Sequence, residues 1–244
     1  MNKQRKQLFF SEGIHSPFPK ESILIYEPFW QLGIVCNKED QMKRLESLLG
    51  VESSREERNF VQKRLISQKQ AVKDALDKGE VVAWVGPSAA EELAFMELAQ
   101  TLPSTENLVL RIISGPLQLR ERAPELVKQL TEYAPFTKKE WSAFLPVFSE
   151  METEKLAERI EPFVYKMRSE NYFDAELLVR LSKNGKPMRP AKLLGEMYAK
   201  RPDFPVPFFR KRIKFLIETG IIERVGNEIS VHSKVQPSGD HDRE

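Results

Sequence analysis

The amino-acid sequence predicts an α/β N-terminal domain with a mostly parallel sheet, followed by an α-helical C-terminal domain that ends in a winged helix. Two observations carry this prediction. In the first half of the chain, short apolar runs alternate with long amphipathic stretches, an order typical of parallel strands joined by crossover helices. In the last third, three helical patterns precede two short strands that flank a Gly-Asn pair.

Four strands are predicted in the first domain. Each is a short run of aliphatic, β-branched or aromatic residues bounded by Gly, Pro, Ser or Asn, the pattern of a buried strand. The runs are residues 8–10, 23–26, 81–85 and 108–113. Because helical patterns separate these strands, we expect them to pair in one sheet with at least one right-handed crossover.

Three helices are predicted between these strands. Apolar residues recur at helical spacing over residues 38–49 and 55–78, and the second pattern stops at Gly79, a common helix terminator. Ser88 opens the third helix, with Glu91 three residues later as its capping-box partner.

The middle of the chain is predicted to be helical. Thr137 and Glu140 form a second capping box, and apolar residues then recur at helical spacing up to Leu156, Ile160 and Phe163. No further short apolar run of the strand type stands out in this stretch, so we expect no strands here.

The predicted domain boundary lies at residues 133–135, where Pro135 coincides with the loss of the strand pattern. The α/β domain then covers residues 1–132, and the helical domain with its winged helix covers residues 137–233. Residues 234–244 are rich in charged and small polar side chains, so they are predicted to form a disordered tail.

The last third carries the clearest pattern. Its predicted helices are residues 174–183, 189–200 and 206–219, and its strands are residues 221–225 and 228–231. Pro190 suits a first helical turn, Gly220 ends the last helix, and Gly226 with Asn227 suits a two-residue hairpin. Three short helices followed by a hairpin are the order of a winged helix-turn-helix.

Several kinds of site lack support in the sequence. Cys36 is the sole cysteine, so no disulfide can form within the chain, and a reducing compartment is expected. His15, His232 and His241 are scattered without metal-ligand spacing, so we expect neither a metal site nor a cofactor. The apolar runs are too short for a signal peptide or a membrane span. We therefore expect a cytoplasmic protein with no membrane partner.

The first half also resembles a known family. Residues 81–93 read Val-Val-Ala-Trp-Val-Gly-Pro-Ser-Ala-Ala-Glu-Glu-Leu, and residues 23–27 and 31–33 read Ile-Leu-Ile-Tyr-Glu and Gln-Leu-Gly. With the late Arg-rich helix, these motifs resemble an uncharacterised bacterial two-domain family, whose halves are domains of unknown function eighteen-thirty-five and thirty-six-fifty-eight. Members usually follow their first strand with Gly-Asp-Ser, where this chain has Ser-Glu-Gly at residues 11–13. The resemblance implies a fold and no activity.

Positive charge is concentrated in residues 183–214, which we call the basic island. Ten Lys and Arg face two acidic residues there, a local charge of +8 in a chain whose net charge is +2. The cations are Lys183, Lys186, Arg189, Lys192, Lys200, Arg201, Arg210, Lys211, Arg212 and Lys214. Such an island on an acidic body is typical of a protein that binds the phosphates of a nucleic acid.

Five residues of the island are candidate contacts to duplex DNA. Arg210, Lys211 and Lys214 fall away from the apolar stripe of their helix and are expected to be solvated, and Arg189 and Lys192 begin the preceding helix. A charged solvent face, a protein partner or self-association would explain the same pattern. The predicted wing counts against DNA, because it carries two glutamates and one arginine over residues 221–231.

A second candidate site lies in the α/β domain. Gly86 and Ser88 follow a strand and open a helix, where free backbone N–H groups can hold an anion. Ser11 and Glu27 would lie at the same edge of a parallel sheet. The same residues also fit an ordinary helix start with polar loops, and no Gly-rich phosphate motif is present.

The function we expect is non-enzymatic DNA binding or regulation, with residues 206–219 as the recognition helix. The alternatives are an α/β enzyme or a nucleotide-binding or anion-binding protein acting at residues 86–88, and a winged helix that contacts only protein.

Overall fold

The computed structural model describes residues 5–10, 18–28, 46–47, 50, 54–86, 88–112, 135–145, 156–183, 185–201 and 204–232. The predicted tail and nearly all of the predicted helix at residues 38–49 lie outside these ranges. Within the described ranges, no helix has the length and apolar character needed to cross a membrane.

The chain divides into two compact units. The N-terminal unit contains Met1–Val35 and Ser53–Met167, and the C-terminal unit contains Cys36–Glu52 and Arg168–Glu244. The main division therefore follows Met167, later in the chain than residues 133–135, where the sequence pattern placed it.

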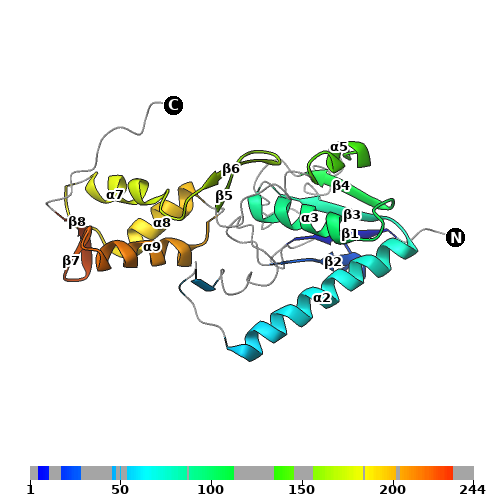
Figure 1. The fold of residues 1–244 in the computed structure, drawn as a ribbon, viewed down its shortest axis with the longest axis horizontal. Helices are drawn as coiled ribbons and strands as arrows, with labels where there is room; N and C mark the ends of the chain where they lie inside the picture. Colours follow the sequence, from blue (N-terminus) through cyan, green and yellow to red (C-terminus); the bar gives the residue numbers. More distant parts are fainter. Residues whose placement is uncertain are drawn as a thin grey trace. The chain divides into compact units, whose positions relative to one another are not determined.

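A four-stranded parallel sheet forms the centre of the N-terminal unit (Figure 1). It contains β1 (Lys6–Phe9), β2 (Ile23–Ile25), β3 (Val81–Val85) and β4 (Leu108–Ile112) in the order β2-β1-β3-β4. All three strand pairs are parallel, so the four predicted strands share one sheet as expected. The strand order changes direction at β1, and the carboxyl ends of β1 and β3 form the edge where α/β proteins usually bind ligands.

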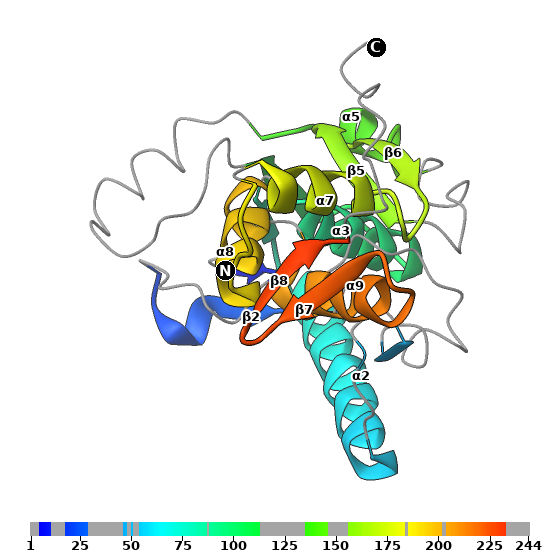
Figure 2. The ribbon, with the colours of Figure 1, turned by 90° about the vertical axis from the view of Figure 1, so that its left-hand side faces the viewer.

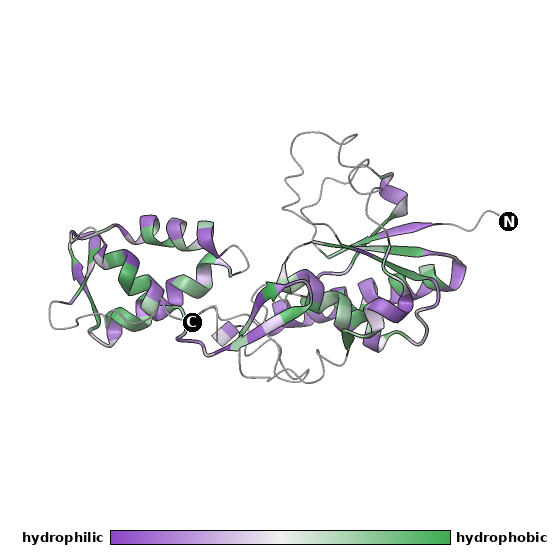
Figure 3. Ribbon diagram, turned by 90° about the horizontal axis from the view of Figure 1, so that it is seen from above, coloured by the Kyte–Doolittle hydropathy of each residue, from purple (hydrophilic) through white to green (hydrophobic). Residues whose placement is uncertain are grey.

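Apolar side chains cover both faces of this sheet, and the strands are largely hydrophobic in Figure 3. On one face Phe9, Val82 and Trp84 pack with Phe18. On the other face lie the two long helices, α2 (Arg55–Lys78) and α3 (Ala89–Thr101). Nine residues of α3 are buried, which fixes this helix firmly against the sheet.

Smaller elements complete the N-terminal unit. They are the 3-10 turn η1 (Lys20–Ser22) and the short helix α5 (Lys138–Ser142). The predicted capping box of Thr137 and Glu140 starts α5. Trp141 then packs edge-on against Phe95 of α3, with ring centroids 5.6 Å apart.

Residues 156–168 correct the helical prediction for this stretch. They form two paired strands, β5 (Leu156–Glu161) and β6 (Val164–Arg168). The helical spacing of the apolar residues ran across Pro162, which lacks an N–H group and disrupts a helix interior by about 3 kcal/mol. Phe163 completes the turn with a left-handed φ of 58°. The hairpin packs near α3, which explains why the N-terminal unit extends to Met167.

The C-terminal unit contains three helices followed by a hairpin (Figure 2). These are α7 (Asp174–Ser182), α8 (Pro190–Lys200) and α9 (Val206–Glu218), then β7 (Ile222–Val225) and β8 (Glu228–Val231). Gly226 has a left-handed φ of 63° in the turn between the strands. Met188, between α7 and α8, pairs with Ile229 of β8 through two backbone hydrogen bonds of 2.9 and 2.8 Å.

Aromatic residues dominate the core of this unit. The rings of Phe173, Phe204, Phe208 and Phe209 are almost fully buried and meet mostly edge to face. Such edge-to-face pairs stabilise a fold beyond the area they bury. Leu216 of α9, 1% exposed, lies in the same hydrophobic interior as the buried residues of α7, α8 and β8.

Candidate nucleic-acid interface

The amphipathic pattern of α8 decides where its basic residues point. Leu193, Leu194 and Met197 are buried, so Arg189 and Lys192 remain on the exposed side of the helix start. Arg189 is the N-cap residue with extended backbone, and Pro190 takes the first helical position as predicted.

The same logic places the cations of α9. Its buried face contains Phe208, Phe209, Ile213 and Leu216. Arg210 is exposed and makes no ion pair with another described residue. The side chain of Lys214 is 76% exposed and lies 3.7 Å from the carboxylate of Glu218, a pair worth little at a solvated surface.

Lys211 corrects the expectation of a solvated side chain. Its Nζ lies 3.0 Å from Oε1 of Glu170, and the lysine side chain is 27% exposed. The carboxylate precedes α7 and approaches α9 only in the folded unit. A phosphate would have to compete with Glu170 for this lysine, so Lys211 is a poorer candidate for a phosphate contact than Arg210 or Lys214.

Arg212 of the basic island is a structural residue. Its guanidinium is almost buried, donates from Nε and Nη2 to Asp174 at 2.9 and 2.5 Å, and lies 3.4 Å from Glu170. The hydrogen bonds to Asp174 raise the pKa of Arg212 above its ordinary value. A bidentate pair of this kind holds α9 against the start of α7.

Glu176 of α7 compensates two more cations of the island. Lys200 and Arg201 reach its carboxylate at 3.0 and 3.2 Å, and Arg180 of α7 lies at 3.2 Å. Burial by itself raises the pKa of Glu176, but the hydrogen bond from Lys200, the charge of Arg201 and the hydrogen bond from Arg180 bring it below its ordinary value. Residues 168–232 hold thirteen Lys and Arg against eight Asp and Glu, so the local charge of +8 becomes +5 over this longer stretch.

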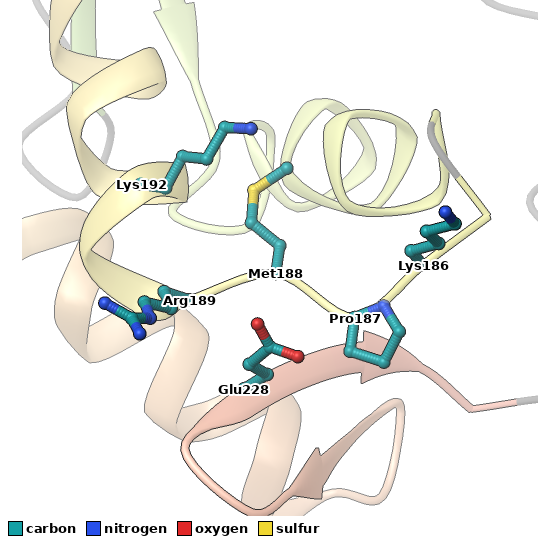
Figure 4. Close-up of a pocket in the computed structure, with 6 residues that line it drawn as sticks. All are labelled: Lys186, Pro187, Met188, Arg189, Lys192 and Glu228. Atoms are coloured by element: carbon teal, nitrogen blue, oxygen red, sulfur yellow. The ribbon is translucent and has the colours of Figure 1, made fainter.

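Five cations of the island remain exposed and make no ion pair with another described residue. They are Lys183, Lys186, Arg189, Lys192 and Arg210. Lys186 was not singled out from the sequence, because its loop shows no periodicity that would orient it. In the structure it lines a surface cavity of ≈ 460 Å³ (Figure 4). The other lining residues are Pro187, Met188, Arg189, Lys192 and Glu228.

The candidate anion edge is already occupied by a side chain. Ser88 caps α3 by accepting from the N–H of Glu91, but the Glu91 carboxylate accepts from Gly86 N–H at 2.6 Å. The Glu91 carboxylate therefore accepts from Gly86, two residues before the N-cap, and not from the N–H of Ser88 as a capping box requires. A Cβ at Gly86 would lie 2.9 Å from this carboxylate, so the glutamate lies directly against the Gly86 backbone. A ligand anion would have to displace Glu91.

The other two residues predicted at this edge do not add to a site. Ser11 lies outside the described residues. Glu27 faces α2, where its carboxylate lies 3.4 Å from Arg64 and its N–H donates to Gln68 at 3.2 Å.

Two buried polar clusters were missed by the sequence analysis. Glu92 of α3 is fully buried and accepts from Arg159 Nε, Phe163 N–H and Tyr165 O–H at 2.8, 3.0 and 2.7 Å. Burial raises the pKa of Glu92, and these three hydrogen bonds offset the rise in part. All three donors belong to the β5–β6 hairpin, so the cluster ties the hairpin to α3.

The second cluster joins β2, α2 and α3. The phenol of Tyr26 donates to Glu97, whose other oxygen lies 3.0 Å from Nζ of Lys69. Burial, with the adjacent Glu97 charge, raises the pKa of Tyr26 above its ordinary range. These groups satisfy one another and hold the layers together.

No group of three or more His, Cys, Asp or Glu residues that could hold a metal ion occurs in the described part of the chain. In comparisons with known proteins, no family model, no curated protein and no solved structure matches the chain.

Proposed function

We propose that the C-terminal unit is a winged helix that binds duplex DNA, with α9 as its recognition helix. The topology supports this proposal. Helices α7, α8 and α9 precede the β7–β8 hairpin, and the Met188–Ile229 bridge adds a short third strand between the first two helices. This order of helices and short strands is that of a winged helix-turn-helix.

The observation that carries the proposal is the sorting of the cations. Carboxylates within the unit hold Lys200, Arg201, Lys211 and Arg212, whereas Arg189, Lys192 and Arg210 stay exposed without an ion pair to a described residue. Exposed cations whose charge is not compensated are the groups that phosphates attract.

The wing adds little to the binding we propose. Exposed Glu223 and half-exposed Glu228 accompany Arg224 on the hairpin, so its charge opposes a phosphate backbone. We therefore assign the phosphate contacts to the helices. No ligand role is proposed for the Gly86 edge, because Glu91 already takes its N–H group.

The test is binding of the full chain to a fluorescently labelled DNA duplex, followed by anisotropy between about 50 and 200 mM salt. We expect the logarithm of the affinity to fall linearly with the logarithm of the salt concentration. The double variant Arg210→Ala/Lys214→Ala should reduce that slope by about 2, about 1 for each phosphate contact removed.

The matched control is Lys138→Ala/Lys139→Ala, which removes the same charge from exposed positions of α5 in the other unit. Its slope should equal that of the wild type. If wild-type protein fails to bind duplex DNA even at the lowest salt, or if both double variants behave alike, α9 is not a recognition helix. Contact with protein then becomes the favoured function of this unit.

A further inference from the structure

We infer that the cavity beside Met188 is a second contact site on the same duplex, taking successive phosphates of one strand, and that Glu228 limits its strength. This inference rests on the proposed function. It adds Lys186 to the proposed contact residues, and it gives Glu228 of the wing the role of weakening the binding.

The cavity is formed by three separate segments. The α7–α8 loop supplies Lys186, Pro187 and Met188, α8 supplies Arg189 and Lys192, and β8 supplies Glu228. The backbone bridge of Met188 to Ile229 holds the loop against β8, so the floor of the cavity is fixed by hydrogen bonds of 2.9 and 2.8 Å. Its volume is ≈ 460 Å³.

The charged side chains around the cavity do not form ion pairs with one another. Lys186, Arg189 and Lys192 make no ion pair with any described residue, and Glu228 lies on the same cavity without coming within ion-pair distance of them. Three cations and one carboxylate leave a local charge of +2 facing solvent. Uncompensated positive charge over a cavity attracts phosphate oxygens, and the carboxylate opposes them.

The directions of the side chains favour a strand over a single phosphate ion. Figure 4 shows the charged ends of Lys186, Lys192 and Arg189 in three different directions around Met188, with Glu228 pointing from β8 toward the loop. To bind one phosphate together, all three cations would have to turn from these directions and be ordered at a single point, at a cost in side-chain entropy. Consecutive phosphates of a nucleic-acid strand can meet them one by one.

Two changes test this site in the same anisotropy assay. Lys186→Ala/Lys192→Ala should reduce the salt slope by about 2, compared with no change for Lys138→Ala/Lys139→Ala. Glu228→Gln should tighten binding roughly threefold at low salt, because it removes a like charge beside the bound strand. Its matched control is Glu223→Gln on the neighbouring strand of the hairpin, outside the cavity, which should tighten binding less.

A competition arm separates the two sources of phosphate. At equal ionic strength, sodium phosphate should displace the duplex no better than sodium chloride. Stronger displacement by phosphate would mean that the cavity binds a single phosphate ion and not a strand, and it would overturn the inference. If the wild type binds DNA but the cavity variants match their controls, the inference is wrong while the proposed function stands. If the wild type does not bind DNA at all, both are wrong. Circular dichroism should show every variant folded, since the changed side chains are exposed or half-exposed.

Discussion

Replacing Arg212 with methionine separates a structural cation from the cations proposed to bind phosphate. Methionine keeps much of the aliphatic volume and removes the guanidinium that donates to Asp174 at 2.9 and 2.5 Å. Asp174, whose side chain is 16% exposed, then lacks its main partner. Glu170 retains its pair with Lys211.

The expected loss in unfolding free energy is about 3 kcal/mol. Removing one partner of a buried ion pair costs about 3 to 5 kcal/mol, because the other charge is left uncompensated. The lower end applies here, since Asp174 keeps some contact with solvent. Adding Asp174→Asn removes the orphaned charge. The loss in unfolding free energy of the double variant should therefore be smaller than the sum of the two single losses, by at least about 1 kcal/mol.

The chain offers a convenient assay for this effect. All three tryptophans belong to the N-terminal unit, so their fluorescence follows that unit during urea unfolding. Far-ultraviolet circular dichroism also detects α7, α8 and α9. Arg212→Met should shift the circular dichroism transition to lower urea while the fluorescence transition stays nearly in place.

Three results would refute this reasoning. They are a loss below about 1 kcal/mol, additive effects of Arg212→Met and Asp174→Asn, and a lower salt slope for DNA binding by folded Arg212→Met protein. The last result would make Arg212 a phosphate contact, as proposed for Arg210.

Three further predictions concern the core and two carboxylates, Glu92 and Glu176. Leu216→Ala should cost about 2 to 5 kcal/mol in the circular dichroism transition, because its side chain is 1% exposed; a loss well under 1 kcal/mol would contradict its burial. Glu92 has a raised pKa, so the folded state holds its proton more tightly than the unfolded state. Fluorescence-detected stability relative to Glu92→Gln should therefore rise as the pH falls from about 7 toward about 4. Glu176 has a lowered pKa, so its contribution to folding stability is present above the ordinary pKa of 4.5 and is lost as the pH falls through the folded pKa. Stability relative to Glu176→Gln should therefore fall in that range. Stability trends of the same sign for Glu92 and Glu176 would contradict these pKa directions.

Local patterns predicted many elements well. β3 and α2 have the predicted bounds, because a five-residue apolar run and a capped helix ending at a glycine are specified by neighbouring residues. The β5–β6 hairpin was mispredicted, because apolar spacing alone fits a helix there. Pro162 and the hydrogen bonds that the hairpin donates to Glu92 decide in favour of strands, and these hydrogen bonds need the folded α3.

In the candidate site, too, some features follow from neighbouring residues and others only from the folded structure. The exposed positions of Arg210 and Lys214 follow from the apolar stripe of α9, which is a local property. The compensation of Lys211 and Arg212 does not, since their carboxylate partners lie 38 to 42 residues earlier in the chain. The resemblance to the two-domain family stays a prediction.

The sequence by itself determined the positions of most helices and strands and the total charge of the basic island, because periodicity and charge are properties of neighbouring residues. Only the tertiary structure decided which of those charges remain available to a ligand. Coulomb attraction depends on distance in space and on exclusion of water, and folding brings Glu170, Asp174 and Glu176 within ion-pair distance of four island cations. It leaves the cations around Met188 uncompensated by described residues, and there the proposed contact with a phosphate backbone begins.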